Sequence, residues 1–446
     1  MSFRKRQSQG IRALKARGSV QLLSDVPPQE CETQIKRGED SAFSPSQHGP
    51  FSVTEKKALE SLFAEQGPFA PGIAVDCVPT PAVPAPPAPC LHTARGLGVS
   101  TDVSVPSAAT GPPEAPKIME GEELPGLLVN EIGGMHGILH DHVEFLKKHF
   151  CLITMKEFLE NKKNMSKKVQ AVYLWWHRPV IDKDLLQSLP NLKVIANSGV
   201  GMDHLDLKLI ASFGVKMANA PCAVSSCTAD AGMALLLASA RRLVEGYHLA
   251  VSPGMEYNEA DFLGVEVTGA TLGIIGMGSI GYKIALRAKA FEMKILYHNR
   301  TRRKEQEEQA VGAIYCEKID DLLCQADFVV VVVSLTPQTH KLIGKREMEL
   351  MKPTATLINI SRGAVVDQEA LAIALHTGVI RAAALDVTYP EPLPRDHPLL
   401  KLKNVIITPH LGIKTDKATR MITEEAVENI LAALTGLPMP SEVLPS

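Results

Sequence analysis

Long hydrophobic runs are missing from this 446-residue sequence. A membrane-spanning helix needs about 20 mainly apolar residues, whereas the longest run that we expect to form a buried strand extends only from Phe328 to Val333. We therefore expect no membrane partner. Aromatic residues are also scarce, at 5% of the chain, and the apolar content comes largely from Ala, Val, Leu and Ile. That composition is typical of helices packed on parallel strands.

Neither sign of charge is in large excess, because 47 basic residues stand against 49 acidic ones. We therefore expect no nucleic-acid partner. The eight cysteines lack the regular spacing of a disulfide framework, and several lie in apolar runs, which indicates reduced thiols in an intracellular protein. Cys222 and Cys227 have no second pair or His cluster nearby, so we expect no metal site. The expected location is cytoplasmic.

The first 122 residues differ in composition from the remainder. They contain 16 of the 31 prolines and offer little apolar surface to offset the entropy lost on ordering. We expect residues 1–122 to form a disordered Pro/Ala-rich extension. Its first 24 residues carry six basic side chains and no acidic one. A solvated basic tail is the favoured interpretation, and a mitochondrial transit peptide is the alternative.

From about Gly126 the sequence alternates between short apolar runs and amphipathic stretches. Strands that alternate with helices imply parallel sheets with right-handed crossovers. A first series predicts strands at 127–130, 151–154, 171–174, 194–197 and 215–219. A second series predicts strands at 271–276, 294–299, 313–316, 328–334, 356–360, 382–387 and 405–408. This α/β pattern predicts two Rossmann-like, doubly wound parallel-sheet domains with an active-site cleft between them.

Two longer helices are expected around this second series. Residues 227–250 are Ala-rich and apolar over most of the predicted helical surface, so this helix should be buried or lie in a subunit contact. Residues 415–435 are expected to form a closing helix at the end of the chain.

Glycines with the spacing of a dinucleotide-binding loop follow the strand at 271–276. Gly276, Gly278 and Gly281 form a G-x-G-x-x-G pattern, with a helix expected at 282–291. Such glycines allow a tight turn, backbone approach to a pyrophosphate and close packing of helix on strand. The free amides at the start of the helix would hold the phosphates. The alternative is a glycine-rich turn without a ligand.

The end of the next strand indicates which nicotinamide cofactor is bound. An NAD enzyme usually carries an acidic residue here to hold the ribose 2′-hydroxyl, but this chain has Asn299, Arg300 and Thr301, followed by Arg302 and Arg303. Guanidinium groups can bind a 2′-phosphate, which a carboxylate would repel. We therefore expect a preference for NADPH, with NADH possible; a solvated basic turn is the alternative.

Three late segments, each following a predicted strand, carry the side chains needed to reduce a 2-oxo acid. Arg362 can bind a carboxylate, and His410 can donate a proton to the developing alkoxide. Glu391 can hold the far nitrogen of the imidazole and favour its protonated form. Taken singly, the arginine could cap a helix, the glutamate could sit on a turn and the histidine could be a core residue. Together behind the glycine loop they predict a catalytic site.

The segments SGVGMDHLD, GIIGMGSIG, INISRGAVVDQEAL, AALDVTYPEPLPRDHPL and NVIITPHLG carry a family resemblance. Residues 126–440, about 70% of the 446 residues, resemble the D-isomer-specific 2-hydroxyacid dehydrogenases, above all glyoxylate/hydroxypyruvate reductases and 2-ketogluconate reductase-like proteins. The resemblance implies that Arg362, Glu391 and His410 are catalytic and that the backbone amides of Val200 and Gly201 hold the substrate carboxylate. The expected substrate-binding residues are Val200, Gly201, Arg362 and His410. It implies a homodimer formed through the cofactor domain.

The same resemblance assigns the cofactor contacts. Asp386 matches the aspartate that contacts the nicotinamide amide, and Thr228 begins the helix beside the nicotinamide. The complete set of expected cofactor contacts is Thr228, Gly276, Gly278, Ser279, Ile280, Gly281, Asn299, Arg300, Thr301, Arg303, Ser334, Leu335, Thr336, Ile360, Ser361, Arg362, Asp386, His410 and Gly412.

One segment departs from the family pattern. Trp175, Trp176, His177 and Arg178 follow a predicted strand where many relatives have small residues. They either reshape the substrate end of the cleft, which would suit a longer polyhydroxy acid, or only pack between domains.

These observations predict an NAD(P)H-dependent reductase that moves hydride to the keto carbon of glyoxylate, hydroxypyruvate or 2-ketogluconate. We expect a substrate domain at 123–222 completed by 412–446, and an NAD(P)-binding domain at 223–411. A dinucleotide-sensing interaction protein of the corepressor type is the alternative function.

Overall fold

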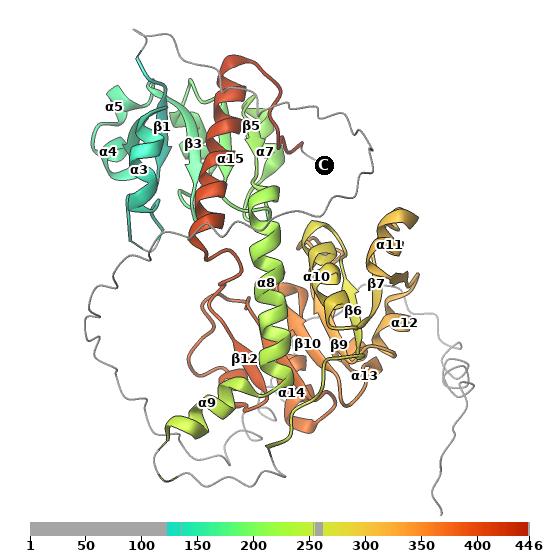
Figure 1. The fold of residues 1–446 in the computed structure, drawn as a ribbon. Coiled ribbons are helices and arrows are strands. Elements are labelled where there is room, and N and C mark those ends of the chain that lie inside the picture. The colour runs from blue at the N-terminus through green and yellow to red at the C-terminus, as the bar shows by residue number, and fades with distance from the viewer. Residues whose placement is uncertain (1–122, 135, 253, 255–261, 445–446) are drawn as a thin grey trace, which may run out of the picture. The chain divides into compact units, whose positions relative to one another are not determined.

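The computed structural model describes residues 123–134, 136–252, 254 and 262–444. The predicted disorder of residues 1–122 lies outside this range. The described chain contains two separate parallel sheets, shown with their helices in Figure 1.

The first sheet has five strands in the order β2-β1-β3-β4-β5. Their bounds are β1 Gly126–Val129, β2 Cys151–Thr154, β3 Val169–Leu174, β4 Val194–Asn197 and β5 Lys216–Ala218. The helices of this part are α3 His140–Lys147, α4 Met155–Glu160, α5 Lys162–Met165, α6 Lys183–Ser188 and α7 Leu207–Ser212. Helix α15, Asp416–Thr435, returns from the end of the sequence and packs on β3, β4 and β5. Its buried Ile422 and Ile430 share a core with Ala171 and Ala196.

The second sheet has seven strands in the order β12-β11-β10-β9-β6-β7-β8. Their bounds are β6 Thr271–Ile275, β7 Lys294–His298, β8 Ala313–Tyr315, β9 Phe328–Val331, β10 Thr356–Asn359, β11 Ala382–Leu385 and β12 Val405–Ile407. The helices that accompany them are α10 Ser279–Ala290, α11 Glu305–Val311, α12 Ile319–Leu323, α13 Lys345–Leu350 and α14 Gln368–Thr377; two 3₁₀ turns lie at Gly363–Val365 and Pro398–Lys401. The predicted strands in both series are confirmed, each within three residues at either end; the largest difference is at β9, which ends at Val331 rather than at residue 334.

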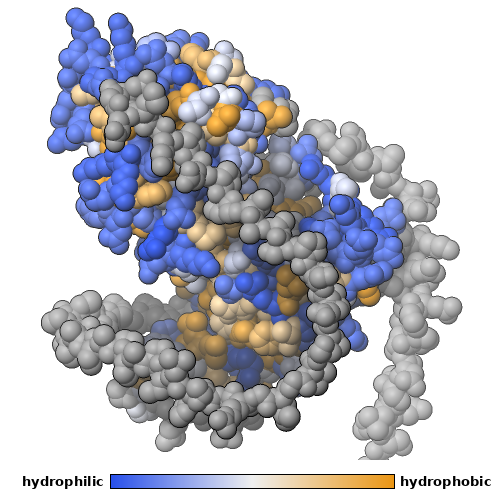
Figure 2. Space-filling model, turned by 45° about the horizontal axis from the view of Figure 1, so that its top comes forward, coloured by the Kyte–Doolittle hydropathy of each residue, from blue (hydrophilic) through white to orange (hydrophobic). Residues whose placement is uncertain are grey.

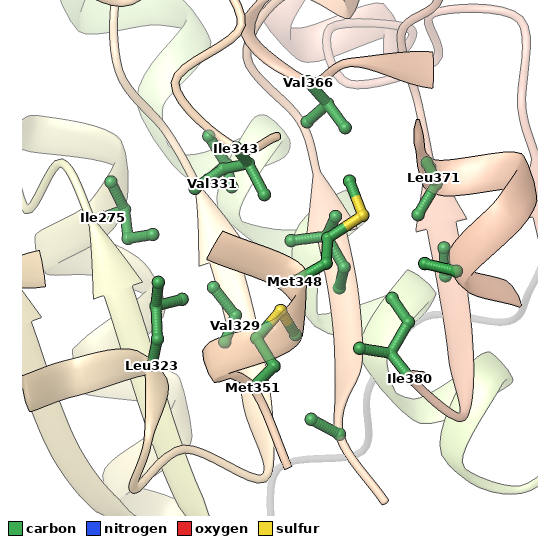
Figure 3. Packing of buried hydrophobic residues seen from close by; sticks show 14 of the residues in the cluster. Ile275, Leu323, Val329, Val331, Ile343, Met348, Met351, Val366, Leu371 and Ile380 are labelled. Atoms are coloured by element: carbon green, nitrogen blue, oxygen red, sulfur yellow. The ribbon is translucent and has the colours of Figure 1, made fainter. Parts of the chain in front are cut away.

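The strand order of the second sheet places the glycine loop at its topological switch point. The chain runs from β6 through β7 to β8 on one side, then returns to β9 on the other side of β6. Ligands of such sheets bind at the carboxyl ends of the strands beside this point. A hydrophobic core packs against this sheet. It contains Val329 and Val331 of β9, Met348 of α13 and Leu323 of α12, which are labelled in Figure 3.

The prediction of one helix over residues 227–250 is wrong in its bounds. The structure has two helices, α8 at Pro221–Ala240 and α9 at Leu243–Val251. The break occurs because Arg242 adopts a left-handed backbone with φ of 51°, while the Val265 N–H donates to the Ala240 carbonyl. Helix α8 also starts earlier, at a proline, whose missing N–H costs nothing in the first turn.

Helix α8 is, by length and composition, apolar enough to cross a membrane, as core helices also can be. More than half of it is buried within the described chain, where it contacts α10, α15 and β10. In α9, by contrast, Leu243, Val244, Tyr247 and Val251 are exposed. Figure 2 shows the apolar patches of one face among a mainly hydrophilic surface.

Candidate active site

The three predicted catalytic segments follow neighbouring strands. Arg362 lies after β10, Glu391 after β11 and His410 after β12. The pairs β10–β11 and β11–β12 are parallel, so these segments leave the sheet at one edge. The structure therefore brings together residues that the sequence separates by almost fifty positions.

His410 and Glu391 form a pair in which the imidazole Nδ1 lies 3.2 Å from the carboxylate Oε1. Both groups retain some exposure, 19% for the His410 side chain and 38% for that of Glu391. This contact orients the ring and leaves Nε2 available to a substrate. His410 has a φ of 54°, a backbone region that non-glycine residues rarely occupy, so the surrounding loop must hold it there.

Asp386 is the residue that holds this loop. Its Oδ1 accepts hydrogen bonds from the Thr408 hydroxyl at 2.6 Å and the Leu411 N–H at 2.7 Å, and its Oδ2 accepts from the Gly412 N–H at 2.8 Å. The Asp386 carbonyl accepts from the His410 N–H at 2.8 Å. Asp386, which the sequence predicts as a nicotinamide contact, thus holds the loop that carries His410, and motif spacing did not reveal this structural function.

The Arg362 guanidinium is held on two sides. Its Nε donates to Asp203 Oδ1 at 3.0 Å, and one terminal nitrogen donates to the Ser361 carbonyl at 2.9 Å. Burial by itself would raise the pKa of the Asp203 carboxyl, but Arg362 and local hydrogen bonds hold that pKa below its ordinary value. Asp203 was not among the predicted site residues. It stands within the segment SGVGMDHLD, but its partner lies 159 residues away, so only the fold reveals the pair.

The loop after β4 lies directly against this guanidinium. A Cβ placed on Gly201 would come within 1.7 Å of the Arg362 Nη2, so no side chain fits there. Asn197 fixes the loop, because its Nδ2 donates to the Gly199 carbonyl at 2.9 Å and the Gly201 carbonyl at 3.0 Å. A positive charge and a constrained backbone therefore meet at one point, as a carboxylate-binding site requires.

Arg362, Asp386, His410 and the Gly201 loop line one cavity with a volume of about 90 Å³. Its lining includes the predicted residues Val200, Gly201, Thr228, Ile280, Ile360, Arg362, Asp386, His410 and Gly412. It also includes Ser198, Gly199, Val224 and Ile413, which the sequence did not indicate. Within the segment 175–178, which departs from the family pattern, Trp176 and His177 line the cavity. Trp175 is only 4% exposed and packs in the core. Two residues of this segment thus form part of the cavity wall.

The glycine loop has the geometry that a dinucleotide needs. Gly276 has a φ of 98°, and a Cβ there would lie 2.7 Å from the Val332 carbonyl oxygen. A Cβ on Gly281 would lie 2.5 Å from the Gly276 carbonyl oxygen, whereas one on Gly278 would meet nothing within 4 Å. The first and third glycines thus allow close packing, and the second faces open space. Helix α10 begins at Ser279 without a side-chain cap, so its first amides are available to phosphate.

The arginines of the basic segment after β7 differ in their contacts. Arg302 binds Glu308 through two hydrogen bonds of 2.8 Å. Arg303 donates to the Met277 carbonyl at 2.9 Å and to Glu307 at 2.6 Å. Asn299 accepts from the Met277 N–H at 2.6 Å, which ties this segment to the glycine loop. Arg300 is exposed.

The remaining predicted cofactor contacts also follow strands of this sheet. Ser334, Leu335 and Thr336 lie after β9, and the Ser334 carbonyl accepts from the Thr339 hydroxyl at 2.6 Å. Ser361 follows β10 and donates through its hydroxyl to Asn359 Oδ1 at 2.7 Å. Within the described residues, no group of three or more His, Cys, Asp or Glu side chains could hold a metal ion.

Comparison with known proteins identifies the family. A sequence profile described as "D-isomer specific 2-hydroxyacid dehydrogenase, NAD binding domain" matches residues 233–412. Glyoxylate reductase of Thermococcus litoralis is 44% identical over 261 residues, which are 57% of this chain and 78% of the relative. This chain belongs to the D-isomer-specific 2-hydroxyacid dehydrogenase family.

The chain is also similar to a second curated relative and to a solved structure. Glyoxylate/hydroxypyruvate reductase B of Yersinia pestis is 42% identical over 258 residues, 57% of this chain and 78% of the relative. The structure of an NADPH-dependent glyoxylate/hydroxypyruvate reductase from Sinorhizobium meliloti, in complex with NADP and malonate, superposes with a TM-score of 0.62 at 27% identity. The match covers 72% of this chain and 96% of that structure's chain. The family resemblance and the two-sheet α/β fold predicted from sequence are confirmed.

Proposed function

We propose that this family member reduces a small 2-oxo acid, such as glyoxylate or hydroxypyruvate, to the D-2-hydroxy acid with NAD(P)H. The observation that carries the proposal is the convergence of Arg362, His410 and the Gly201 loop on one cavity. The names of the relatives support the substrate class, since glyoxylate and hydroxypyruvate reductases match this chain at 42–44% identity.

Each side chain has one task in this proposal. The Arg362 guanidinium and the backbone around Val200 and Gly201 bind the substrate carboxylate. His410 donates a proton to the carbonyl oxygen, and Glu391 keeps its ring oriented through the 3.2 Å contact. When bound, the reduced nicotinamide supplies the hydride that the carbonyl carbon receives. The proton and the hydride together convert the ketone to an alcohol, so the reaction needs no further reactant.

The residues of the cofactor site fit a dinucleotide, and those after β7 fit a 2′-phosphate. No carboxylate occupies the position where an acidic residue would bind the ribose 2′-hydroxyl, and Arg300 is exposed beside it. Asn299 is bound to the backbone of the glycine loop, so the whole segment lies next to the expected phosphates. We therefore propose NADPH as the preferred cofactor. A cytoplasmic location and a homodimer remain part of the proposal.

The test is the oxidation of NADPH at 340 nm by the purified full chain with glyoxylate, hydroxypyruvate and 2-ketogluconate, repeated with NADH. Rapid turnover of one of these acids with NADPH is the expected result. Tight NADPH binding without turnover of any of them would contradict the proposed reaction and would favour a dinucleotide-sensing interaction protein.

A further inference from the structure

The segment Trp175–Arg178, directly after β3, forms a two-residue hairpin turn. The Trp175 N–H donates to the Arg178 carbonyl at 2.9 Å, and the Arg178 N–H donates to the Trp175 carbonyl at 3.1 Å. The two central residues, Trp176 and His177, have φ angles of 51° and 60°. Positive φ at both central positions is the conformation of a type I′ turn, which normally takes Asn-Gly or Gly-Gly. A bulky aromatic pair therefore occupies a backbone that disfavours it.

Strained residues of this kind persist where their side chains are needed in one place. The two central residues of this turn, Trp176 and His177, line the candidate active-site cavity together with Arg362 and His410. The strain thus coincides with the candidate active site.

Contacts on both sides fix the position of Trp176. Its ring meets the His410 ring edge-on, with centroids 5.3 Å apart and planes at 90°. The Lys414 ammonium lies 4.0 Å from the Trp176 ring centroid, a cation–π contact. The turn is therefore tied to the catalytic histidine and to the segment that leads into α15.

The neighbouring Trp175 anchors the turn in the core. Its ring contacts Tyr173 and His142, with centroid distances of 6.1 Å and 6.2 Å. Behind it, Thr423 links these two residues, because its hydroxyl lies 3.3 Å from the Tyr173 hydroxyl and 2.9 Å from His142 Nδ1. This buried network from three elements gives the turn a rigid base.

His177 lines the same cavity as Arg362 and His410. It stacks on His204, with ring centroids 4.0 Å apart and planes at 25°. Burial and the nearby Arg362 lower the pKa of His177, so its ring is neutral near pH 7. A neutral imidazole offers one N–H donor and one nitrogen acceptor. That pair complements a hydroxyl group, which also donates once and accepts.

We propose that His177 is a specificity-determining residue that binds a hydroxyl on C3 of the 2-oxo acid, so that the site selects hydroxylated substrates. This inference rests on the proposed function, in which Arg362 takes the carboxylate and His410 the carbonyl oxygen. The substituent on the carbonyl carbon then faces the wall formed by Trp176 and His177. A site that hydrogen-bonds a substrate hydroxyl rejects the analogue that lacks it far more strongly than a merely apolar site can.

Hydroxypyruvate and pyruvate test the proposal, because they differ by this one hydroxyl. We expect the wild-type chain to prefer hydroxypyruvate in kcat/KM by about 100-fold or more. His177→Phe should keep a stacked ring but lower this preference at least about tenfold. His177→Asn keeps a hydrogen-bonding side chain, so its preference for hydroxypyruvate should exceed that of His177→Phe. His204→Phe is the matched control, since that ring stacks on His177 but does not line the cavity, and its preference should match the wild type.

An unchanged preference in His177→Phe, or an equal loss on both substrates, would overturn the assignment. Absence of turnover in the wild type would instead refute the proposed function, and binding would then decide the inference. The chain has only two tryptophans, Trp175 and Trp176, so its fluorescence reports directly on this turn. D-Glycerate and D-lactate differ by the same hydroxyl. Tighter binding of glycerate to the NADP-bound chain, abolished in His177→Phe, supports the inference, and equal binding refutes it.

Discussion

Asp203 and Arg362 are separated by 159 residues in the sequence, yet the Asp203 carboxylate accepts a hydrogen bond of 3.0 Å from the Arg362 Nε. Their side chains are 21% and 23% exposed, so the pair is largely shielded from solvent. Since Nε is engaged and one terminal nitrogen is bound to the Ser361 carbonyl, the orientation of the guanidinium is set before a substrate arrives. Asp203 therefore positions the group that we propose to bind the substrate carboxylate.

Replacing Asp203 by Asn should weaken substrate binding more than turnover. The amide keeps the shape of the carboxylate but loses the charge that holds the guanidinium, so we expect KM for the 2-oxo acid to rise about tenfold with a smaller change in kcat. Steady-state kinetics at saturating NADPH measures both, and Asp203→Glu should recover part of the affinity. Asp230→Asn is the control, because Asp230 pairs with Arg287 at the surface and its side chain is 65% exposed. A purely structural role of Asp203 would instead lower stability and leave KM unchanged.

Removing His410 or Arg362 should abolish most turnover and leave NADPH binding nearly intact. We expect kcat/KM to fall by about a thousandfold or more in His410→Ala and Arg362→Ala, because the proton donor or the carboxylate ligand is then missing. Glu391→Gln should be milder, with a loss of about ten- to a hundredfold, since the imidazole keeps a hydrogen-bond partner. Calorimetric titration with NADPH checks that the cofactor site survives. Turnover that persists unchanged in either alanine variant would rule out the proposed mechanism.

The arginines after β7 should have unequal effects on cofactor preference. Arg302 is committed to Glu308, and Arg303 to Glu307 and the Met277 carbonyl, whereas Arg300 is exposed. We expect Arg300→Ala to raise KM for NADPH about tenfold and to change KM for NADH little. Arg302→Ala should mainly lower the melting temperature, because it removes the charged partner of the buried Glu308 carboxylate and leaves only the Tyr297 hydroxyl bound to it. If both variants kept the wild-type ratio of NADPH to NADH, this segment would not determine cofactor choice.

His204 should make the protein less stable in mild acid. Its two ring nitrogens are buried without a hydrogen-bond partner among the described residues, and burial together with His177 lowers its pKa to about 4. The unfolded chain then binds this proton more readily than the folded one, so stability is complete above pH 6.5 and is lost as the pH falls toward 4.

The variant His204→Phe isolates this contribution. Between pH 7 and pH 5 the wild type should lose about 1 kcal/mol of unfolding free energy that the variant keeps, allowing for partial access of solvent to the ring. Urea unfolding of both proteins at the two pH values measures the difference. Parallel losses in the two proteins would show that His204 does not titrate in this range.

Local patterns in the sequence were sufficient for most of the described secondary structure. The strands were found because apolar runs between turn residues reflect burial of each strand on both faces, a property that each segment carries by itself. The Gly276–Gly281 loop was found for the same reason, since its conformation depends on the absence of side chains at Gly276 and Gly281. The break between α8 and α9 was missed, because it depends on the left-handed Arg242 and on the return of Val265 to the Ala240 carbonyl.

Within the candidate site, the sequence by itself determined the residue types, and the tertiary structure decided their partners. Arg362, Glu391 and His410 could be predicted because each follows a strand in a recognisable motif. The pairing of Asp203 with Arg362 and the stacking of His177 on His204 join positions far apart in the chain, which no local pattern records. The sequence left open whether Trp176 and His177 reach the substrate or only pack between domains. The fold placed both in the cavity wall, because they are the central residues of a two-residue turn that the buried Trp175 anchors.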